Sequence, residues 1–176
     1  MRLRTDSAAA TKRVAASLAP LLRAGDVVLL SGDLGAGKTV FVQGLAAALG
    51  VDEPVTSPTF TLAAVYRHGR LPLHHLDAYR LERLSEVLDL DLPGLLDDDA
   101  VVCIEWGEVL VPELPRDFLA IRLRLADVGE PADVRTIETE FVGPSWTDRA
   151  RLVTNALAAA AGGNAAGAGT TADPAG

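Results

Sequence analysis

Eight consecutive residues, Gly32–Thr39, carry glycines, a lysine and a threonine at the spacing that phosphate binding requires. Such a glycine-rich turn lets successive backbone N–H groups point into one concavity, and a helix that follows adds the positive end of its dipole. Lys38 would then reach the β- and γ-phosphates of a nucleotide, while the Thr39 hydroxyl would hold Mg²⁺. The pattern predicts a P-loop, and the alternative is a chance match in an unrelated loop.

The residues on both sides of this stretch favour the P-loop. Val27–Leu30 is a short apolar and β-branched run, as expected of a buried strand. Val40–Leu49 has the composition of a helix, which Gly50 would end. The motif therefore lies where a strand passes into a helix, which is the setting that a P-loop needs.

Two acidic residues near other apolar runs are candidates for the rest of a nucleotide site. Glu105 follows the apolar run Ala100–Ile104, at a position where P-loop proteins usually carry an Asp that serves the metal. We expect Glu105 to complete the metal site directly or through water, with a capping carboxylate or an ion-pair partner as the alternatives. Asp77 could orient the attacking water or a metal-bound water, but the N-cap of a helix is an equally natural role.

A hydroxyl-rich segment, Val55–Leu62, lies between the P-loop helix and Asp77. Ser57, Thr59 and Thr61 flank the fixed backbone of Pro58 in this segment. Such a loop could order around a γ-phosphate and relax after hydrolysis, as switch loops do. Simple turn chemistry explains a Ser-Pro pair equally well.

Five further side chains near these acids have roles that the sequence leaves open. His74 and His75 would point to opposite faces of a strand, so we expect them not to share one metal ion, and we expect one to be buried and one exposed. Tyr79 and Arg80 could face a partner or the nucleotide, and Arg80 could equally pair with the surrounding acids. Trp106 is expected to be a packing or partner anchor rather than a platform for a base.

Composition bounds the class of protein. The 176 residues, 49% of them hydrophobic, are enough for one domain that buries about 70% of the surface of the unfolded chain. The net charge of −8 argues against this chain alone gripping a nucleic-acid backbone, so we expect any nucleic acid to be held by a partner. The single Cys103 excludes an internal disulfide. With neither a membrane span of about 20 apolar residues nor a signal peptide, we expect a cytoplasmic protein.

The remaining pattern predicts an α/β fold with a mixed sheet. Thr5–Ser7 offers N-cap oxygens to a helix over Ala8–Leu18. Phe60–Tyr66 and Leu71–Leu76, joined by the turn Arg67–Arg70, are expected to form an antiparallel hairpin. A hairpin of this kind in an otherwise parallel P-loop sheet makes the sheet mixed.

Later elements complete a three-layer, P-loop NTPase-like fold. We expect an acidic, leucine-rich helix over Glu82–Leu96, strands over Phe118–Leu125 and Arg135–Val142, and a closing helix over Trp146–Leu157. Residues 1–157 would form a single domain. Residues 158–176 would form an Ala/Gly-rich disordered tail, because their composition offers no apolar face to bury.

Taken together, the motifs resemble the TsaE family, also called YjeE. The segments that carry the resemblance, in this order and spacing, are Gly32–Thr39, Ser57–Leu62, His75–Leu81 and Glu105–Trp106. The resemblance runs from about Thr11 to Trp106 and continues weakly to about Val142. The Ser-Pro-Thr-Phe and His-x-Asp-x-Tyr-Arg segments are its specific part, because many other proteins contain a P-loop.

The resemblance implies a bacterial P-loop ATPase required for forming threonylcarbamoyladenosine in tRNA. It implies ATP and Mg²⁺ as cofactors and weak ATPase activity when the chain is alone. It also implies that the chain acts with a TsaB–TsaD complex and that the partners, rather than this chain, contact tRNA. Lys38, Asp77 and Glu105 would be catalytic, and Thr39 and Glu105 would hold the metal. The nucleotide-binding residues that it implies are Thr11, Gly35, Ala36, Gly37, Lys38, Thr39, Val40 and Arg135.

Two positions depart from the family pattern. Val40 stands where a second Thr is frequent, so its side chain offers no hydroxyl to a phosphate or metal. Gly107 stands where Pro is frequent, and we expect it to alter only the turn. Two other functions stay open: a P-loop small-molecule kinase, although neither an acceptor pocket nor an arginine-rich lid is evident after Glu105, and a nucleotide-gated interaction module with negligible turnover.

Overall fold

Buried parallel strands form at both of the continuous apolar runs that predict them, and the alternating segment Phe118–Leu125 forms a third strand parallel to them. The computed structural model describes residues 1–80 and 92–162. In it, β2 (Val27–Ser31) pairs in parallel with β5 (Val101–Glu105) on one side and with β6 (Phe118–Leu125) on the other. β2 and β5 are buried along almost their whole length, because each has a strand on both sides and packed side chains on both faces.

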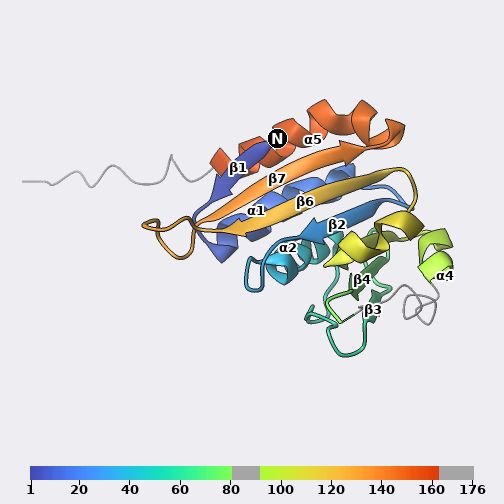
Figure 1. Cartoon of the computed structure of the whole chain (residues 1–176). Coiled ribbons are helices and arrows are strands. Elements are labelled where there is room, and N and C mark those ends of the chain that lie inside the picture. The colour runs from blue at the N-terminus through green and yellow to red at the C-terminus, as the bar shows by residue number, and fades with distance from the viewer. Residues whose placement is uncertain (81–91, 163–176) are drawn as a thin grey trace, which may run out of the picture.

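Antiparallel strands extend this sheet at both ends, so the predicted mixed sheet is confirmed. β3 (Ala63–Tyr66) and β4 (Leu73–Asp77) form the predicted hairpin, and β4 pairs in parallel with β5. At the other end, β7 (Arg135–Val142) pairs with β6, and β1 (Arg2–Thr5) adds an edge strand that the sequence analysis did not predict. The strand order is β1-β7-β6-β2-β5-β4-β3 (Figure 1).

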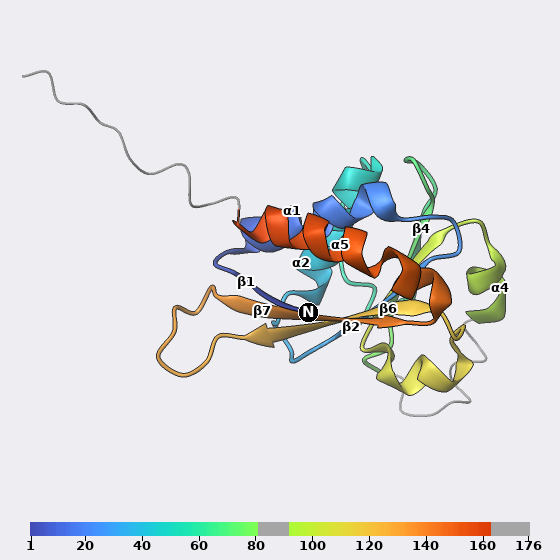
Figure 2. The ribbon, with the colours of Figure 1, turned by 90° about the horizontal axis from the view of Figure 1, so that it is seen from above.

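Three α-helices cover one face of the sheet, as Figure 2 shows with the sheet close to edge-on. They are α1 (Ala8–Leu18), which continues into the 3₁₀ helix η1 (Ala19–Leu21), α2 (Lys38–Leu49) and α5 (Pro144–Gly162). α1 packs against both α2 and α5. As predicted, Ser7 caps α1, because its Oγ accepts a hydrogen bond from the Ala10 N–H at 3.2 Å. Within residues 1–80 and 92–162, none of the helices combines the length and hydrophobicity that a transmembrane span requires.

A smaller layer packs on the opposite face. It consists of α4 (Leu92–Asp97) and the 3₁₀ helix η2 (Gly107–Glu113), which Figure 2 shows away from the three larger helices. Leu92 and Leu110 from this layer pack with Leu29 and Ile104 of the sheet in a second apolar cluster. The two clusters, one on each face, give the three layers of the predicted α/β fold.

The first strand of the hairpin is shorter than predicted. It begins at Ala63 rather than Phe60, because a turn closes just before it: the Leu62 N–H donates to the Pro58 carbonyl at 2.6 Å. Leu62 also adopts a left-handed conformation, with φ of 63°, which interrupts the extended backbone. Phe60 is consequently 84% exposed rather than part of the sheet.

The C-terminal helix is longer than predicted. α5 includes the predicted segment Trp146–Leu157 and continues to Gly162, so the expectation that the tail starts at residue 158 is wrong. Four of the five added residues are the alanines 158–161, and alanine has the highest helix propensity. Residues 163–176 lie outside the described residues. So do residues 82–91 of the predicted acidic helix, whose last five residues, 92–96, fall in α4.

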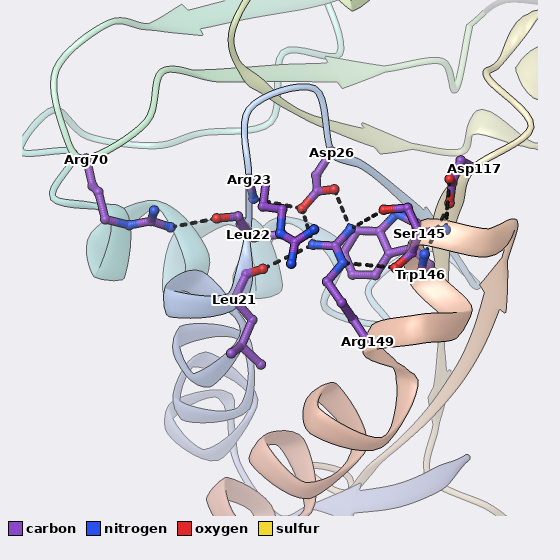
Figure 3. A network of polar contacts seen from close by, with 9 residues as sticks. All are labelled: Leu21, Leu22, Arg23, Asp26, Arg70, Asp117, Ser145, Trp146 and Arg149. Carbon is purple, nitrogen blue, oxygen red and sulfur yellow. Dashed lines mark hydrogen bonds and ion pairs between the residues drawn. The ribbon is translucent and has the colours of Figure 1, made fainter.

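A buried ion pair ties α5 to the segment that precedes β2 (Figure 3). Arg149 donates from Nη1 and Nη2 to the two carboxylate oxygens of Asp26 at 2.8 and 2.6 Å. Arg149 also donates to the carbonyls of Leu21 and Ser145, and its guanidinium lies 4.1 Å from the centre of a Trp146 ring. The hydrogen bonds with Asp26 raise the pKa of the Arg149 guanidinium. The pair therefore joins two segments far apart in the sequence, α5 and the stretch 21–26, through charged hydrogen bonds.

We expect Arg149→Met to lower the free energy of unfolding by about 3 kcal/mol, because it leaves the Asp26 carboxylate buried without its counter-charge. Chemical denaturation followed by circular dichroism measures this change. Arg151→Met is the matched control, since Arg151 is exposed on the same helix and its loss should change stability by about 0.5 kcal/mol or less. Equal effects of the two variants would contradict a stabilising role for the buried pair.

Candidate nucleotide site

The P-loop connects β2 to α2, and its glycines at positions 32, 35 and 37 all adopt positive φ angles. Gly32 has φ of 128°, and a Cβ at this position would lie 1.9 Å from the Leu123 carbonyl oxygen of β6. Gly37 has φ of 103° and is the N-cap of α2. Both conformations are strained for residues that carry a side chain. The two glycines therefore allow the loop to turn closely past β6 and to direct the N-terminus of α2 into the site.

Lys38 is buried at the start of α2, with only 4% of its surface exposed. Its Nζ donates to the carbonyls of Gly32 at 2.7 Å and Asp33 at 3.0 Å, and lies 3.6 Å from the centre of a Trp106 ring. Burial lowers the pKa of Lys38, against the opposing effect of the nearby Glu105 carboxylate. An ammonium group with so little water around it interacts strongly with an anion that enters the site.

The Glu105 carboxylate contacts the P-loop directly. Its Oε1 accepts a hydrogen bond from Thr39 Oγ1 at 2.8 Å. Glu105 is 3% exposed and ends β5, where the sheet register pairs it with Leu30 near the end of β2. Parallel pairing in this register therefore brings together the two residues that were predicted to hold the metal.

Asp77 joins the hydroxyl-rich loop to the site. Its Oδ2 accepts hydrogen bonds from Ser57 Oγ at 2.5 Å and Thr59 Oγ1 at 2.7 Å. Its Oδ1 accepts from the Tyr79 N–H at 3.0 Å, a contact that closes a local turn. Thr61, which the sequence grouped with Ser57 and Thr59, is exposed and does not line the pocket. The predicted helix that Asp77 could cap lies largely outside the described residues.

These residues line one open pocket of about 370 Å³. Its walls come from the P-loop, from Ser57 and Thr59, and from the ends of β4 and β5. Ligand pockets commonly enclose about 300–1,000 Å³, so the volume suits a small molecule. Lys38, Asp77 and Glu105, the three predicted catalytic residues, all contribute to this single pocket.

A smaller hollow of about 90 Å³ adjoins the larger pocket and shares Gly35, Gly37 and Val40 with it. Thr11 and Arg135, both predicted to border the nucleotide, line this hollow, as does Asp133, which the sequence analysis did not single out. Arg135 donates from Nη2 to the Gly35 carbonyl at 3.4 Å. Ala36 is the one predicted nucleotide-binding residue that lines neither space, because its side chain packs in the apolar core.

Both histidines of β4 are buried, so the expectation that one is exposed is wrong. His74 is 2% exposed and His75 is fully buried, because β4 lies between β3 and β5 with side chains packed on both of its faces. They do point in opposite directions, as predicted: His74 Nε2 lies 3.2 Å from Asp98 Oδ2, whereas His75 Nε2 lies 2.8 Å from Glu105 Oε1. The spacing of His75 and Asp77, two residues apart on one strand, was a signal in the sequence that could have placed His75 at the site.

Trp106 packs against the second apolar cluster and also forms part of the pocket wall. Its backbone is left-handed, with φ of 59°, which is uncommon for a bulky residue and is found preferentially at functional sites. Its ring lies 5.0 Å from the Tyr79 ring and beneath the Lys38 Nζ. The packing role expected from the sequence is therefore confirmed, and the contact with Lys38 is an addition to it.

The oxygen donors of Thr39 and Glu105 fit a magnesium ion. Mg²⁺ prefers hard oxygen ligands and is usually held by one or two protein groups, with phosphates and waters completing its shell. Among the described residues, no group of three or more His, Cys, Asp or Glu side chains could hold a metal ion. A metal bound beside Thr39 and Glu105 would therefore take most of its ligands from the nucleotide and water.

Comparison with known proteins places this site in a family. A family model described as threonylcarbamoyl adenosine biosynthesis protein TsaE matches residues 5–132, a range that contains the P-loop, the hydroxyl-rich loop, Asp77 and Glu105. The chain belongs to the TsaE family. The family match ends before Arg135, so Arg135 is the one predicted nucleotide-binding residue outside it.

Curated TsaE proteins resemble the chain over most of their length. One from Treponema pallidum is 49% identical over 128 residues, which cover 72% of this chain and 94% of the relative. One from Streptomyces coelicolor is 51% identical over 135 residues, covering 73% and 88% respectively. Both are named tRNA threonylcarbamoyladenosine biosynthesis protein TsaE. The crystal structure of Bacillus subtilis YdiB matches the fold with a TM-score of 0.75 and 32% identity, covering 88% of this chain and 94% of that one.

We expect Asp77→Asn to loosen the hydroxyl-rich loop, because an amide in place of the carboxylate weakens the acceptor of the Ser57 and Thr59 hydroxyls. Hydrogen–deuterium exchange of the segment 56–62 should then be about tenfold faster, as follows from a loss of about 1.4 kcal/mol. Asp52→Asn, at an exposed position in the same connection, is the control and should leave exchange unchanged. Unchanged exchange in Asp77→Asn would show that Asp77 does not hold the loop.

Proposed function

We propose that this chain is a Mg²⁺-dependent P-loop ATPase that acts in the cytoplasm with a TsaB–TsaD-like complex to form threonylcarbamoyladenosine in tRNA. The observation that carries the proposal is the hydrogen bond between Thr39 of the P-loop and Glu105 at the end of β5. It joins the two halves of the metal–nucleotide site that we propose for this chain of the TsaE family. The pathway is the one for which the curated relatives are named.

In this proposal the P-loop binds the phosphates and provides most of the groups that stabilise their negative charge. The backbone N–H groups within Gly35–Thr39, apart from that of Ala36, which donates to the Asp33 carbonyl at 3.1 Å, would face the phosphate oxygens together with the N-terminus of α2, and the buried Lys38 ammonium would neutralise charge on the β- and γ-phosphates. Mg²⁺, when bound, would stabilise the negative charge that develops during phosphoryl transfer. Thr39 supplies a ligand to it, and Glu105 binds it directly or orients one of its waters.

Asp77 and the hydroxyl-rich loop form the part of the site that can respond to the nucleotide. Asp77 holds the Ser57 and Thr59 hydroxyls at the edge of the pocket through hydrogen bonds of 2.5 and 2.7 Å. A γ-phosphate or an attacking water would compete for the same hydroxyls and the same carboxylate. Asp77 would therefore orient the water, and the loop would change its contacts between the ATP and ADP states.

The mouth of the pocket supports action with a protein partner. Leu34 is 75% exposed, Phe60 84% and Tyr79 53%, and all three lie in or next to segments that line the pocket. Large apolar side chains exposed together commonly mark a protein interface. The net charge of −8 disfavours direct binding to tRNA, so tRNA would be reached through the partners.

The test is Mg-ATP hydrolysis by the purified chain, alone and with the TsaB–TsaD complex of the same organism. We expect slow hydrolysis by the chain alone and a rate increased by the complex. Lys38→Ala and Glu105→Gln should each reduce the stimulated rate by about 100-fold or more, because each removes a group that stabilises transition-state charge. Glu113→Gln, an exposed acid on η2, should leave the rate unchanged.

Two results would contradict this proposal in different ways. If the complex neither binds nor stimulates the chain, then a screen of small phosphate acceptors would test the kinase alternative. If the complex binds only the ATP-loaded chain but hydrolysis stays negligible, the chain acts as a nucleotide-gated interaction module instead.

A further inference from the structure

A fully buried imidazole shares the carboxylate oxygen that contacts the P-loop. His75 Nε2 lies 2.8 Å from Glu105 Oε1, the same oxygen that accepts the hydrogen bond from Thr39 Oγ1. His75 has none of its surface exposed and does not line the pocket, so it cannot contact a nucleotide itself. Any effect that it has on the site must pass through Glu105.

The surroundings of the ring indicate which nitrogen carries the proton. An ionised carboxylate only accepts hydrogen bonds, so Nε2 must donate to Glu105. His75 Nδ1 is buried and has no hydrogen-bond partner within residues 1–80 and 92–162. A bare ring nitrogen at that place costs less than a buried N–H without an acceptor. The geometry therefore fits a ring with its hydrogen on Nε2.

The two donors restrain the Glu105 side chain in one orientation. A glutamate has several rotatable bonds, so a single contact would leave its carboxylate free to turn. Thr39 and His75 both bind Oε1, and neither binds Oε2. Oε2 is thereby the oxygen that the arrangement leaves for a metal ion or a metal-bound water.

We propose that His75 is a positioning residue that orients the Glu105 carboxylate for Mg²⁺-dependent nucleotide binding. This inference rests on the proposed function, because it needs a metal at Thr39 and Glu105. Groups that hold a metal ligand in place typically change metal affinity or activity by about 10–100-fold when they are removed. His75 is therefore a further residue of the site, although it is buried and does not line the pocket itself.

The neighbouring His74 provides a matched control. It lies on the same strand, is 2% exposed, and faces the opposite layer, where its Nδ1 is 3.2 Å from the Leu95 carbonyl oxygen. Substitution of His74 removes an almost equally buried imidazole from the same strand but leaves the hydrogen bonds of Glu105 in place. A merely structural role of the buried imidazoles would make the two positions behave alike.

The test measures binding of the non-hydrolysable ATP analogue AMPPNP by isothermal titration calorimetry, once with Mg²⁺ and once with EDTA. The ratio of the two affinities isolates the contribution of the metal. In His75→Asn, whose amide reaches the Nδ1 rather than the Nε2 position, we expect the Mg²⁺ enhancement to fall by about tenfold or more. His75→Gln, whose amide can reach the Nε2 position, should keep it, and so should His74→Asn.

The outcomes separate this inference from the proposed function. If wild-type chain shows no Mg²⁺ enhancement, the proposed function fails, and the inference with it. If wild type shows the Mg²⁺ enhancement, three results overturn the inference alone. They are a His75→Asn variant that keeps the enhancement, a His75→Gln variant that loses it to the same extent, and a His75→Asn variant whose affinity for AMPPNP in EDTA falls by the same factor as its affinity with Mg²⁺.

A second measurement uses the wild-type chain and so does not depend on the folding of a variant. ¹⁵N-edited NMR of the His75 ring should show the Nε2–H tautomer, and the Nδ1–H tautomer would overturn the inference.

Discussion

The parallel register between β2 and β5 is the constraint on which the site depends. It pairs Leu30 with Glu105, so the P-loop begins beside the end of β5, where Glu105 lies. The neighbouring pairing of β4 with β5 sets Asp77 opposite Glu105 at the same edge of the sheet. Ligands of open α/β sheets commonly bind outside the carboxyl ends of the strands. A shift of one residue would turn Glu105 to the other face and away from Thr39.

The site contains several buried polar and charged side chains, and the free-energy cost of burying them must be offset by the rest of the structure. Lys38, His75, Asp77 and Glu105 are each less than 5% exposed, and burial of such groups is costly unless they are paired. Hydrogen bonds satisfy much of the hydrogen-bonding capacity of these side chains. Burial nevertheless lowers the pKa of Lys38, so its effect on this ammonium is larger than the opposing effect of the neighbouring carboxylates. The left-handed Trp106 adds backbone strain. The apolar clusters on both faces and the buried Asp26–Arg149 pair hold the sheet that carries this arrangement.

Local signals in the sequence were sufficient for much of the fold and for the centre of the site. The strands Phe118–Leu125 and Arg135–Val142 and the helix Ala8–Leu18 have the predicted bounds, because alternation, helical spacing and a cap are all local. The P-loop was evident for the same reason. β1 was missed because four residues with two arginines carry little strand signal, and only pairing with β7 makes them a strand. The burial of His74 and His75 likewise depends on layers contributed by distant segments.

The side-chain contacts of the site could not be predicted from the sequence, because they join residues that are far apart in the chain. The hydrogen bond from Thr39 to Glu105 joins residues 66 positions apart, and the contact between Arg135 and Gly35 spans 100. Such pairs follow from strand order and register, which no single segment determines. The resemblance to the TsaE family led us to expect Thr39 and Glu105 at one metal site and Arg135 beside the nucleotide, whereas the contacts Thr39–Glu105, Arg135–Gly35 and His75–Glu105 come from the structure.

The most direct test of the central claim is a crystal structure of the chain with AMPPNP and Mn²⁺, in which anomalous scattering locates the metal. We expect phosphates against the backbone N–H groups of Gly35–Thr39, and the metal on Thr39 Oγ1 with Glu105 bound to it directly or through one water. Phosphates bound elsewhere, or a metal that has neither Thr39 nor Glu105 in its surroundings, would contradict it.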